Sequence, residues 1–373
     1  MQENKLKITA SKSMLFYCRE GYEADLAAEL DMLSAKENLY GYAQFIPKST
    51  LVHYHFYAEL SQAQMRSAIA LDDLIFARTR LINFDSLTFS NPHDRVSSVL
   101  EYLRENSLLL DGMFGDVFAE HPDHEEGKQL AKFCKKFLVP LRQAMRKQGS
   151  LSAKPNTGLP YLHLYFTQSN ECLVNISVPK NRNSEPMGIM RLKSPADAPS
   201  RSTLKLEEAI RLFLTKQDQV NCFQKGMTAV DLGACPGGWT YQLVIRGIRV
   251  EAIDNGEMAD SLMATGMVDY HAADGFVYQP KDGHVDWLVC DMIEKPERVA
   301  KLMQTWLLKR LTTSCIFNLK LPMKRRFQIV DELLNEIKSS LEKKQIDFKM
   351  QAKHLYHDRD EISVIIRTST HLS

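Results

Sequence analysis

The stretch that decides the fold is Asp231-Leu232-Gly233-Ala234-Cys235-Pro236-Gly237-Gly238-Trp239-Thr240. It follows a short apolar run at residues 227–230, which predicts a buried parallel strand. Residues 241–244, which open a helix, come directly after it. A strand, a glycine-rich loop and a helix in this order let the backbone approach a nucleoside-bearing ligand closely, because glycine has no Cβ and tolerates a positive φ. The loop is therefore the first candidate for a binding site.

Helical patterns alternate with short apolar runs from Ser202 to the end of the chain. This alternation predicts a doubly wound, Rossmann-like α/β domain. Ligands of such domains bind beyond the carboxyl ends of the strands. The predicted strands before the final hairpin end in polar residues, which are Asp231, Asp254, Asp291 and Lys320. We expect a functional site at this edge of the sheet.

The glycine loop discriminates between two nucleoside ligands. A dinucleotide fingerprint needs a second glycine where the pyrophosphate approaches the backbone, but Cys235 stands there and Pro236 removes the next amide donor. Asp254 after the second strand suits a ribose diol, and Asp274 in an Ala-Asp-Gly turn suits an adenine amino group. A ligand with adenine and ribose but no phosphate fits this pattern, which points to S-adenosylmethionine.

The acceptor of a methyl group is indicated by what the chain contains and lacks. We find no Asn/Asp-Pro-Pro-aromatic turn of amino-group methylation after the fourth strand. Cys290 lies inside a predicted strand and no Pro-Cys pair follows it, which disfavours a pyrimidine-methylating nucleophile. A hydroxyl acceptor needs a base, and a lysine can serve as one. Lys320 lies at a strand end beside the strand that ends in Asp291, and Lys205 is a second candidate lysine.

Composition limits the alternatives. The chain has 373 residues, 44% of them hydrophobic and 25% charged, which is typical of a globular protein with two or three domains. Its seven cysteines are scattered singly and its histidines are not joined by further ligands, so we expect neither disulfides nor a metal site. The polar start at residues 1–12 and the absence of a long apolar run predict a cytoplasmic protein without a membrane segment. With a net charge of +1, a polyanionic partner must meet local basic patches.

The N-terminal half has a different pattern. Over residues 1–85 the predicted order β-α-β-β-α-β indicates a ferredoxin-like unit, with its last strand at residues 75–84. Residues 86–180 form a second part, which ends in a hairpin of two alternating strands at residues 161–166 and 172–178. Residues 181–201 are rich in proline, serine and basic side chains and are predicted to be a linker to the α/β domain at residues 202–373.

A long basic helix is predicted at residues 127–148. Its apolar side carries Leu130, Phe133, Phe137 and Leu141, and no acidic residue occurs between residues 129 and 148. Seven basic residues lie on it, Lys128, Lys132, Lys135, Lys136, Arg142, Arg146 and Lys147. Such a face is either a solvated helix surface or a patch that contacts nucleic acid, and the sequence leaves both open.

Several motifs resemble the heat-shock class of RNA ribose 2′-O-methyltransferases. They are the loop with Cys235-Pro236-Gly237-Gly238-Trp239, and Cys290-Asp291-Met292, Asn318-Leu319-Lys320 and Glu361-Ile362-Ser363-Val364. The chain is more similar still to one bacterial family, the large-subunit ribosomal RNA methyltransferases M. That similarity is dense in the C-terminal half and includes residues 195–209 and Leu355-Tyr356-His357-Asp358-Arg359.

The resemblance implies a class I methyltransferase domain, a THUMP-type RNA-binding region before it, and a cytidine of 23S rRNA as the target. It also implies a catalytic tetrad of Lys205, Asp291, Lys320 and Glu361. Lys320 would be the general base, Lys205 would stabilise the alkoxide, Asp291 would orient Lys320, and Glu361 would position Lys205. The residues implied to hold S-adenosylmethionine are Ser202, Cys235, Pro236, Gly237, Gly238, Asp254, Asp274 and Asp291.

Two other readings of the chain remain open at this stage. One is a non-catalytic ribosomal RNA-binding or assembly factor on a methyltransferase fold, and the other is an enzyme for a small hydroxylated molecule, which leaves the first 180 residues without a role. For the leading reading we expect naked or precursor rRNA as the substrate rather than a finished ribosome, since a paired nucleotide must be extruded. We expect a monomer that needs no metal. Ser202, beyond its place near the cofactor, is also a candidate helix N-cap.

Overall fold

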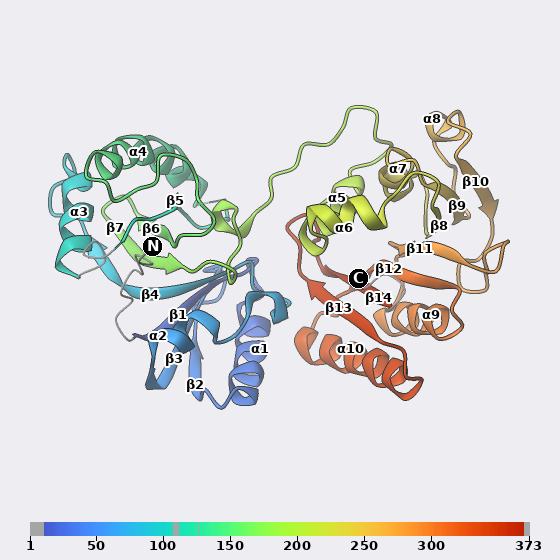
Figure 1. The fold of residues 1–373 in the computed structure, drawn as a ribbon, viewed down its shortest axis with the longest axis horizontal. Helices are drawn as coiled ribbons and strands as arrows, with labels where there is room; N and C mark the ends of the chain where they lie inside the picture. Colours follow the sequence, from blue (N-terminus) through green and yellow to red (C-terminus); the bar gives the residue numbers. More distant parts are fainter. Residues whose placement is uncertain (1–10, 107–111, 126, 369–373) are drawn as a thin grey trace. The chain divides into compact units, whose positions relative to one another are not determined.

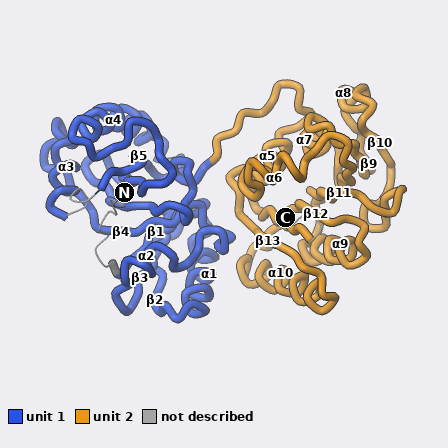
Figure 2. The backbone as a smooth tube through the Cα atoms, in the orientation of Figure 1, with its two compact units in different colours: residues 1–189 blue, residues 190–373 orange. Residues whose placement is uncertain are grey.

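A computed structural model describes residues 11–106, 112–125 and 127–368 of the chain. It separates into two compact units, residues 1–189 and 190–373 (Figure 2). Of the predicted polar segment at residues 1–12, all but the last two residues lie outside the described part. Each unit contains its own seven-stranded sheet.

The first part of the N-terminal unit has the predicted β-α-β-β-α-β order (Figure 1). Its elements are β1 (Ser11–Tyr17), α1 (Glu23–Lys36), β2 (Gly41–Gln44), β3 (Leu51–Leu60), α2 (Gln62–Ser67), a 3₁₀ turn at Leu71–Asp73 and β4 (Thr79–Thr88). Tyr54 and Phe56 of β3 are buried. His53 and His55, which alternate with them, lie on the opposite, partly exposed face. The period-2 alternation of the sequence thus decides which side of β3 meets the core.

The last strand of this part begins four residues later than predicted. Residues 75 and 76 are apolar and buried, but their amides do not enter the sheet. The amide of Ile75 donates to Glu29 Oε1 at 2.5 Å and that of Phe76 donates to Glu29 Oε2 at 3.0 Å. A buried carboxylate on α1 therefore satisfies the backbone that the apolar run alone assigned to a strand.

The second part of the N-terminal unit extends the same sheet. It consists of α3 (Arg95–Glu105), β5 (Asp116–Glu120), α4 (Lys128–Lys147), β6 (Tyr161–Gln168) and β7 (Glu171–Ser177). Strands β6 and β7 form the predicted antiparallel hairpin. Because β7 pairs with β4, one sheet of order β2-β3-β1-β4-β7-β6-β5 runs through both parts.

The C-terminal unit is the predicted doubly wound α/β domain, and its sheet has the order β10-β9-β8-β11-β12-β14-β13. Its strands are β8 (Thr228–Leu232), β9 (Arg249–Asp254), β10 (Val268–Ala272), β11 (Val285–Cys290), β12 (Thr312–Lys320), β13 (Phe348–Lys353) and β14 (Glu361–Thr368). Its helices are α5 (Thr203–Phe213), α6 (Lys216–Cys222), α7 (Gly238–Val244), α8 (Asp260–Met263), α9 (Pro296–Leu308) and α10 (Arg326–Lys343).

The strand order reverses between β8 and β11, which pair in parallel. From β8 the chain moves through α7 to β9, and from β11 it moves through α9 to β12, in the opposite direction across the sheet. Right-handed crossovers in opposite directions place their helices on opposite faces, so α7 and α9 cover different sides. The carboxyl ends of β8 and β11 thus form a switch point, where ligands of this fold bind.

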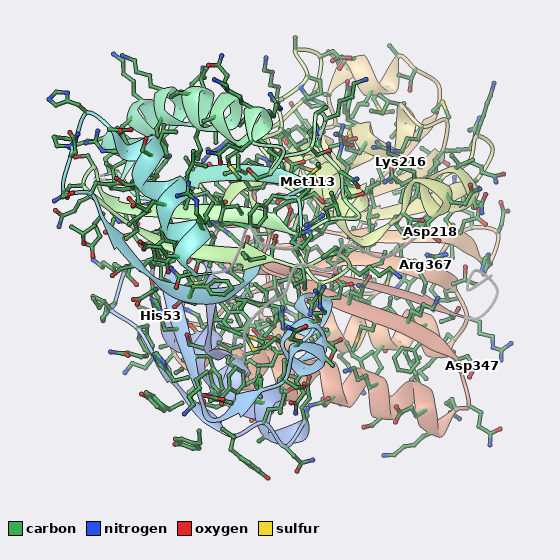
Figure 3. All side chains as sticks on the ribbon, turned by 60° about the vertical axis from the view of Figure 1, so that its left-hand side comes forward. His53, Met113, Lys216, Asp218, Asp347 and Arg367 are labelled. Atoms are coloured by element: carbon green, nitrogen blue, oxygen red, sulfur yellow. The ribbon has the colours of Figure 1, made fainter. Side chains whose placement is uncertain are left out.

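Two strands extend this sheet beyond β12 by antiparallel pairing, and of these only β14 runs opposite to β12. Strand β14 inserts beside β12 with Lys320 opposite Glu361 and Asn318 opposite Ser363, and β13 follows at the edge. An ion pair of 3.0 Å between Arg367 Nη1 and Asp218 Oδ1 fastens the far end of β14 to α6, and Figure 3 labels both residues. The pairing with β12 places the start of β14 next to the carboxyl end of β12.

Residues 181–201 contain no long element. The first of them belong to the N-terminal unit, where Arg182 Nη1 donates to the carbonyl of Leu159 at 2.7 Å and Met187 N donates to Glu120 Oε1. The boundary between the units follows Ile189. Within the described residues we find no helix that is long and apolar enough to cross a membrane.

Candidate active site

The glycine loop joins β8 to α7 at the switch point. Strand β8 continues one residue beyond Asp231, so the prediction that this aspartate follows the strand is wrong. Asp231 is fully buried between β9 and β11, and its Oδ2 accepts a hydrogen bond of 2.6 Å from Thr240 of α7. Burial raises the pKa of Asp231 to about 7, against the opposing effect of the Thr240 bond. No partner is found for its Oδ1 among the described residues.

Asp254, the last residue of β9, organises the loop. Its Oδ2 accepts a hydrogen bond of 2.8 Å from the amide of Cys235, and its Oδ1 accepts from the amides of Asn255 and Gly256. The carboxylate remains partly exposed at the sheet edge. Since a carboxylate offers about four acceptor positions, Asp254 can still accept a hydrogen bond from a ligand hydroxyl.

Two glycines of the loop are required by its geometry. Gly237 has a φ of +115°, a region that disfavours side chains, and a Cβ there would come within 2.2 Å of Leu262. A Cβ on Gly238 would lie 2.1 Å from Ser202 Oγ, so the start of α7 touches the start of α5. Ser202 bonds to Ser200 Oγ at 2.6 Å and does not cap α5, which corrects the capping prediction. The close contact sets the position of α5, and with it that of Lys205.

Asp274 lies in the turn after β10. Its Oδ1 accepts a hydrogen bond of 2.9 Å from the amide of Phe276, and the side chain is exposed. Its position agrees with the expected turn at the carboxyl edge of the sheet. Among the described residues its other carboxylate oxygen forms no hydrogen bond, so this exposed side chain can accept one from a ligand amino group.

The four residues of the predicted tetrad meet at one place beside this loop. Lys205 Nζ, from the first turn of α5, lies 3.2 and 3.0 Å from the two carboxylate oxygens of Asp291 and also pairs with Glu361. Lys320 Nζ, at the end of β12, pairs with the other oxygen of Glu361 and lies 3.8 Å from Asp291 Oδ1. Glu361 therefore bridges the two lysines, and the cluster of two cations and two anions carries no net charge.

The pairing differs in detail from the expected roles. Asp291 was expected to orient Lys320, but its short contacts are with Lys205, and its distance to Lys320 exceeds that of a hydrogen bond. Burial lowers the pKa of Lys205, and the carboxylates of Asp291 and Glu361 outweigh this effect, so the pKa is raised overall. Lys205 is thus held in its charged form. Of the four side chains Lys320 is the most exposed, at 29% against 4% for Glu361, and it is the group that a substrate reaches first.

A hydrogen-bonded chain supports the tetrad from below. Asn318 Nδ2 donates to Asp291 Oδ1 at 3.1 Å, and Ser363 Oγ donates to Asn318 Oδ1 at 2.8 Å. Ser363 Oγ also lies 3.0 Å from Asp358 Oδ2, and burial raises the pKa of Asp358 well above its usual range. The Ser363 hydroxyl thus lies within hydrogen-bond distance of both Asn318 Oδ1 and Asp358 Oδ2, and it links the buried Asp358 to the chain that holds Asp291.

Sequence reasoning assigned no role to these three supporting residues. A signal was present for two of them, since Asn318 precedes Lys320 by two positions and Ser363 follows Glu361 by two. Residues two apart on a strand share a face. The contribution of Asp358 depends on a turn between β13 and β14 and could not be read from such periodicity.

The basic helix is present as α4, with Phe137 and Leu141 buried on its apolar side. Two of its seven basic residues are paired, Lys128 with Glu125 at 2.6 Å and Arg142 with Asp116 at 2.9 Å. The others are exposed, namely Lys132, Lys135, Lys136, Arg146 and Lys147. The exposed cations form a patch that an RNA backbone could contact.

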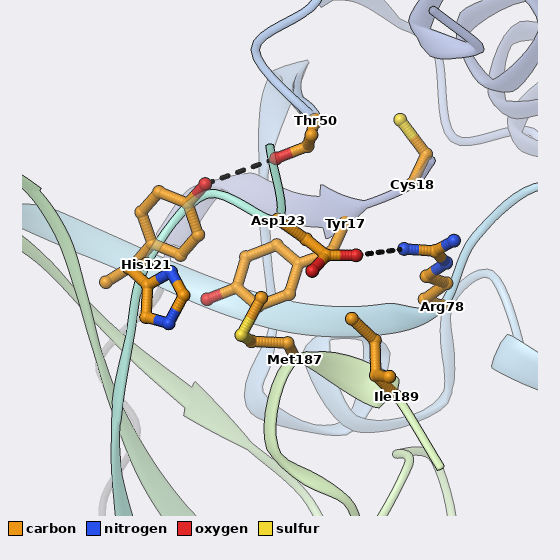
Figure 4. A pocket seen from close by; sticks show the side chains of 9 residues that line it. Tyr17, Cys18, Thr50, Arg78, His121, Asp123, Met187 and Ile189 are labelled. Atoms are coloured by element: carbon orange, nitrogen blue, oxygen red, sulfur yellow. Dashed lines mark hydrogen bonds and ion pairs between the residues drawn. The ribbon is translucent and has the colours of Figure 1, made fainter. Parts of the chain in front are cut away.

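A separate pocket lies wholly within the N-terminal unit (Figure 4). It is lined by Tyr17, Cys18, Thr50, Arg78, His121, Asp123, Tyr165, Met187 and Ile189. Its polar groups bond to one another, Thr50 with Tyr165 at 3.2 Å and Arg78 with Asp123 at 3.4 Å. These internal pairs explain the polar lining of the pocket as part of the folded structure. Among the described residues we find no group of three histidine, cysteine or acidic side chains that could hold a metal ion.

The fold and the edge of the sheet define a class of protein, the Rossmann-like methyltransferases. Residues 198–352 match the model of the FtsJ-like methyltransferases. Residues 11–81 match the RlmM ferredoxin-like domain, and residues 94–178 match the N-terminal model of ribosomal RNA large subunit methyltransferase M.

The chain is similar over nearly its whole length to curated proteins named ribosomal RNA large subunit methyltransferase M. The protein of Alteromonas mediterranea is 51% identical and covers 96% of this chain and 98% of its own length. That of Histophilus somni is 46% identical, with coverages of 95% and 99%. The chain therefore belongs to the ribosomal RNA large subunit methyltransferase M family, and the predicted family, fold class and enzyme class are confirmed.

Solved structures add no functional argument. The crystal structure of TrmN from Thermus thermophilus covers 96% of this chain and all of its own, with 14% identity and a TM-score of 0.34. The family assignment rests on the sequence relatives and on the matched family models.

Proposed function

We propose that the protein transfers a methyl group from S-adenosylmethionine to the ribose 2′-hydroxyl of a cytidine in 23S rRNA. The observation that carries this proposal is the meeting of Lys205, Asp291, Lys320 and Glu361 beside the glycine loop. Removing four charges from water is costly, and a fold without a reaction to perform gains little from such a cluster. This argues against a non-catalytic assembly factor.

The edge of the sheet fits S-adenosylmethionine. Asp231 Oδ1 is a buried acceptor with no hydrogen-bond partner in the described part of the chain. Asp254 retains acceptor capacity for a ribose hydroxyl, and the exposed Asp274 is open to an adenine amino group. Pro236 leaves the loop one amide short of a phosphate cradle. The residues that would hold the cofactor are Ser202, Asp254, Asp274, Asp291 and the backbone of Cys235, Pro236, Gly237 and Gly238. When bound, S-adenosylmethionine supplies a methyl group already activated on a sulfonium.

The tetrad then has to remove one proton and stabilise one developing charge. Lys320 in its neutral form accepts the proton of the 2′-hydroxyl, and Glu361 pairs with the ammonium that results. Lys205 keeps its positive charge because two carboxylates surround it, and this fixed cation stabilises the oxygen as it becomes negative. Asn318 and Ser363 hold Asp291 in place during the reaction.

In this proposal the N-terminal unit meets the remaining requirement, which is to bind a large RNA. Its exposed lysines on α4 provide a surface for a phosphate backbone, and residues 86–180 correspond in this proposal to a THUMP-type region. The substrate is naked or precursor rRNA in the cytoplasm, and the protein acts as a monomer. A small-molecule substrate would leave this unit without a task.

The deciding experiment is the Lys320→Ala variant. We expect methyl transfer to rRNA from cells lacking the gene to be abolished, while binding of S-adenosylmethionine, measured by calorimetry, stays at the wild-type level. Lys309→Ala, which removes an exposed lysine at the end of α9, is the matched control and should be fully active. Full activity of Lys320→Ala would exclude the lysine as the base. Mass mapping of rRNA from the deletion strain identifies the nucleotide and tests the cytidine assignment.

A further inference from the structure

Two short loops border the tetrad. Residues 291–295 join β11 to α9, and residues 321–325 join β12 to α10. Strands β11 and β12 are parallel neighbours, with Cys290 opposite Phe317, so both loops leave the same edge of the sheet. Each starts at a tetrad residue or directly after one, and Asp291 and Lys320 are 3.8 Å apart at their side chains.

Each loop carries an aliphatic side chain that is almost wholly in water. Ile293 is 91% exposed and Met323 is 94% exposed, which are the highest values recorded for large hydrophobic side chains in the described part of the chain. Single exposed hydrophobic residues are common on protein surfaces. Here the two most exposed of the large hydrophobic side chains lie on two loops that flank one reaction site. Their exposure is therefore not scattered, and it needs an explanation at that site.

The neighbouring residues hold these side chains outward. Met292 turns inward, since a Cβ built on Gly233 would come within 2.8 Å of Met292 Cγ. The amide of Asp291 donates to the carbonyl of Leu232 at 3.3 Å, which fastens the start of the loop. In the second loop the amide of Leu321 donates to the carbonyl of Asp360 at 2.8 Å. Ile293 and Met323 therefore project from anchored backbone.

The charge beside them suits a nucleic acid. Lys324 and Arg325 follow Met323 directly, and Lys295 follows Ile293 by two positions, all three exposed. Besides Asp291, the first loop contains one acid, Glu294, which is paired with Arg298. Arg325 lies 3.6 Å from Glu332 in an exposed pair, so Lys295 and Lys324 are the cations without such a partner among the described residues. An apolar tip next to exposed cations matches RNA, which presents base faces beside phosphates.

The tetrad itself is recessed, with Lys205, Asp291 and Glu361 exposed by 17% or less. Such a recessed site favours a nucleotide that has left its stack, because its neighbours then no longer hold its ribose away from Lys320. We infer that Ile293 and Met323 are apolar wedges that pack against the bases on either side of the target nucleotide and hold it out of its stack. Lys324 and Arg325 contact the adjoining phosphates. This inference rests on the proposed function and adds to it the residues that extrude the substrate.

The test uses the full chain and two RNA substrates, a transcript in which the mapped target nucleotide is base-paired and a short single strand containing the same nucleotide. The variants are Ile293→Ser, Met323→Ser and the double variant. Val220→Ser on α6 is the control, since Val220 is also exposed, at 66%, and its helix leads into the amino end of β8. Fluorescence of 2-aminopurine beside the target reports extrusion directly.

We expect the double variant to lose about tenfold or more in kcat/KM on the paired RNA, since unstacking a base costs a few kcal/mol, and to lose the 2-aminopurine signal. On the single strand the loss should be small, and the Kd for S-adenosylmethionine and the melting temperature should match the control. Wild-type rates on the paired RNA, or equal losses on both RNAs, would overturn the wedge assignment while leaving the proposed function intact. A wild-type protein inactive on both RNAs would overturn the proposed function itself, and the inference with it.

Discussion

At the scale of single residues, the site depends on acids whose surroundings differ sharply. Glu361 lies between two lysines and Asp254 accepts three backbone amides, whereas Asp231 is buried with one hydroxyl partner. The same carboxylate group thus serves as a charge partner, a loop anchor and a buried acceptor with a raised pKa. The extent of burial and the neighbouring hydrogen-bond donors, not the residue type, decide which of these roles a carboxylate has.

Asp231 gives a test of this reading through pH. Its pKa in the folded chain is about 7, so the folded state binds more protons than the unfolded state between the two pKa values. Its contribution to stability is therefore lost as the pH rises from about 4 through 7. Asn cannot ionise, so Asp231→Asn should gain about 2–3 kcal/mol relative to wild type between pH 5 and pH 8.

The measurement is urea unfolding without cofactor, followed by tryptophan fluorescence. The three tryptophans, Trp239, Trp287 and Trp306, all lie in the C-terminal unit, so the signal reports that unit. Any fixed penalty from the new amide is the same at both pH values and cancels in the difference. Equal stability differences at pH 5 and pH 8 would show that Asp231 does not titrate as described.

At the scale of elements, the exposed basic face of α4 has no structural role among the described residues of the N-terminal unit. Its buried side packs on the sheet, and most of its cations face solvent. Reversing Lys132, Lys135 and Lys136 to Glu should weaken rRNA binding at least about tenfold at 0.1 M salt. The slope of log affinity against log salt should fall by about 2–3, since each lost phosphate contact contributes about 0.9.

The control for this prediction is the same reversal on α10, at Lys338, Lys343 and Lys344, which are equally exposed but interleaved with acids. Binding is followed by filter retention or anisotropy over a salt series. Unchanged affinity in the α4 variant, or an equal loss in the α10 variant, would remove the patch from the RNA-binding surface.

At the scale of the whole molecule, the two units have independent sheets. All strands of the first sheet precede residue 178, and all strands of the second follow residue 227. Every residue proposed for catalysis and for cofactor binding lies in the second unit. The folding and the proposed chemistry of the second unit can therefore be tested separately from the binding of a large RNA.

We expect a fragment of residues 190–373 to fold cooperatively and to bind S-adenosylmethionine within about twofold of the full chain, since no strand of its sheet is removed. It should not methylate rRNA, because in the proposed function the N-terminal unit binds the RNA. Circular dichroism melting, calorimetry and a methyl-transfer assay check the three statements. A fragment that methylates rRNA at the full-chain rate would show that the N-terminal unit is dispensable.

Much of the site could be predicted because it consists of local motifs. The loop around Gly237, the acids at the carboxyl ends of β9 and β11 and the lysine at the end of β12 follow from short patterns with a clear physical reason. The strand predicted at residues 75–84 was displaced because a distant carboxylate, Glu29, captured its first amides. Ser202 was wrongly expected to cap α5, since Ser200 takes its hydroxyl and Gly238 packs against it.

The sequence by itself determined the class of fold and the family, and it proposed the candidate site residues that the structure brings together. Periodicity and motifs are local properties, and they survive without knowledge of the packing. Only the tertiary structure decided which charges meet. Lys205 and Asp291 are 86 residues apart, and Glu361 reaches Lys320 because β14 inserts antiparallel beside β12. Such pairings arise from long-range strand register, which short patterns cannot specify.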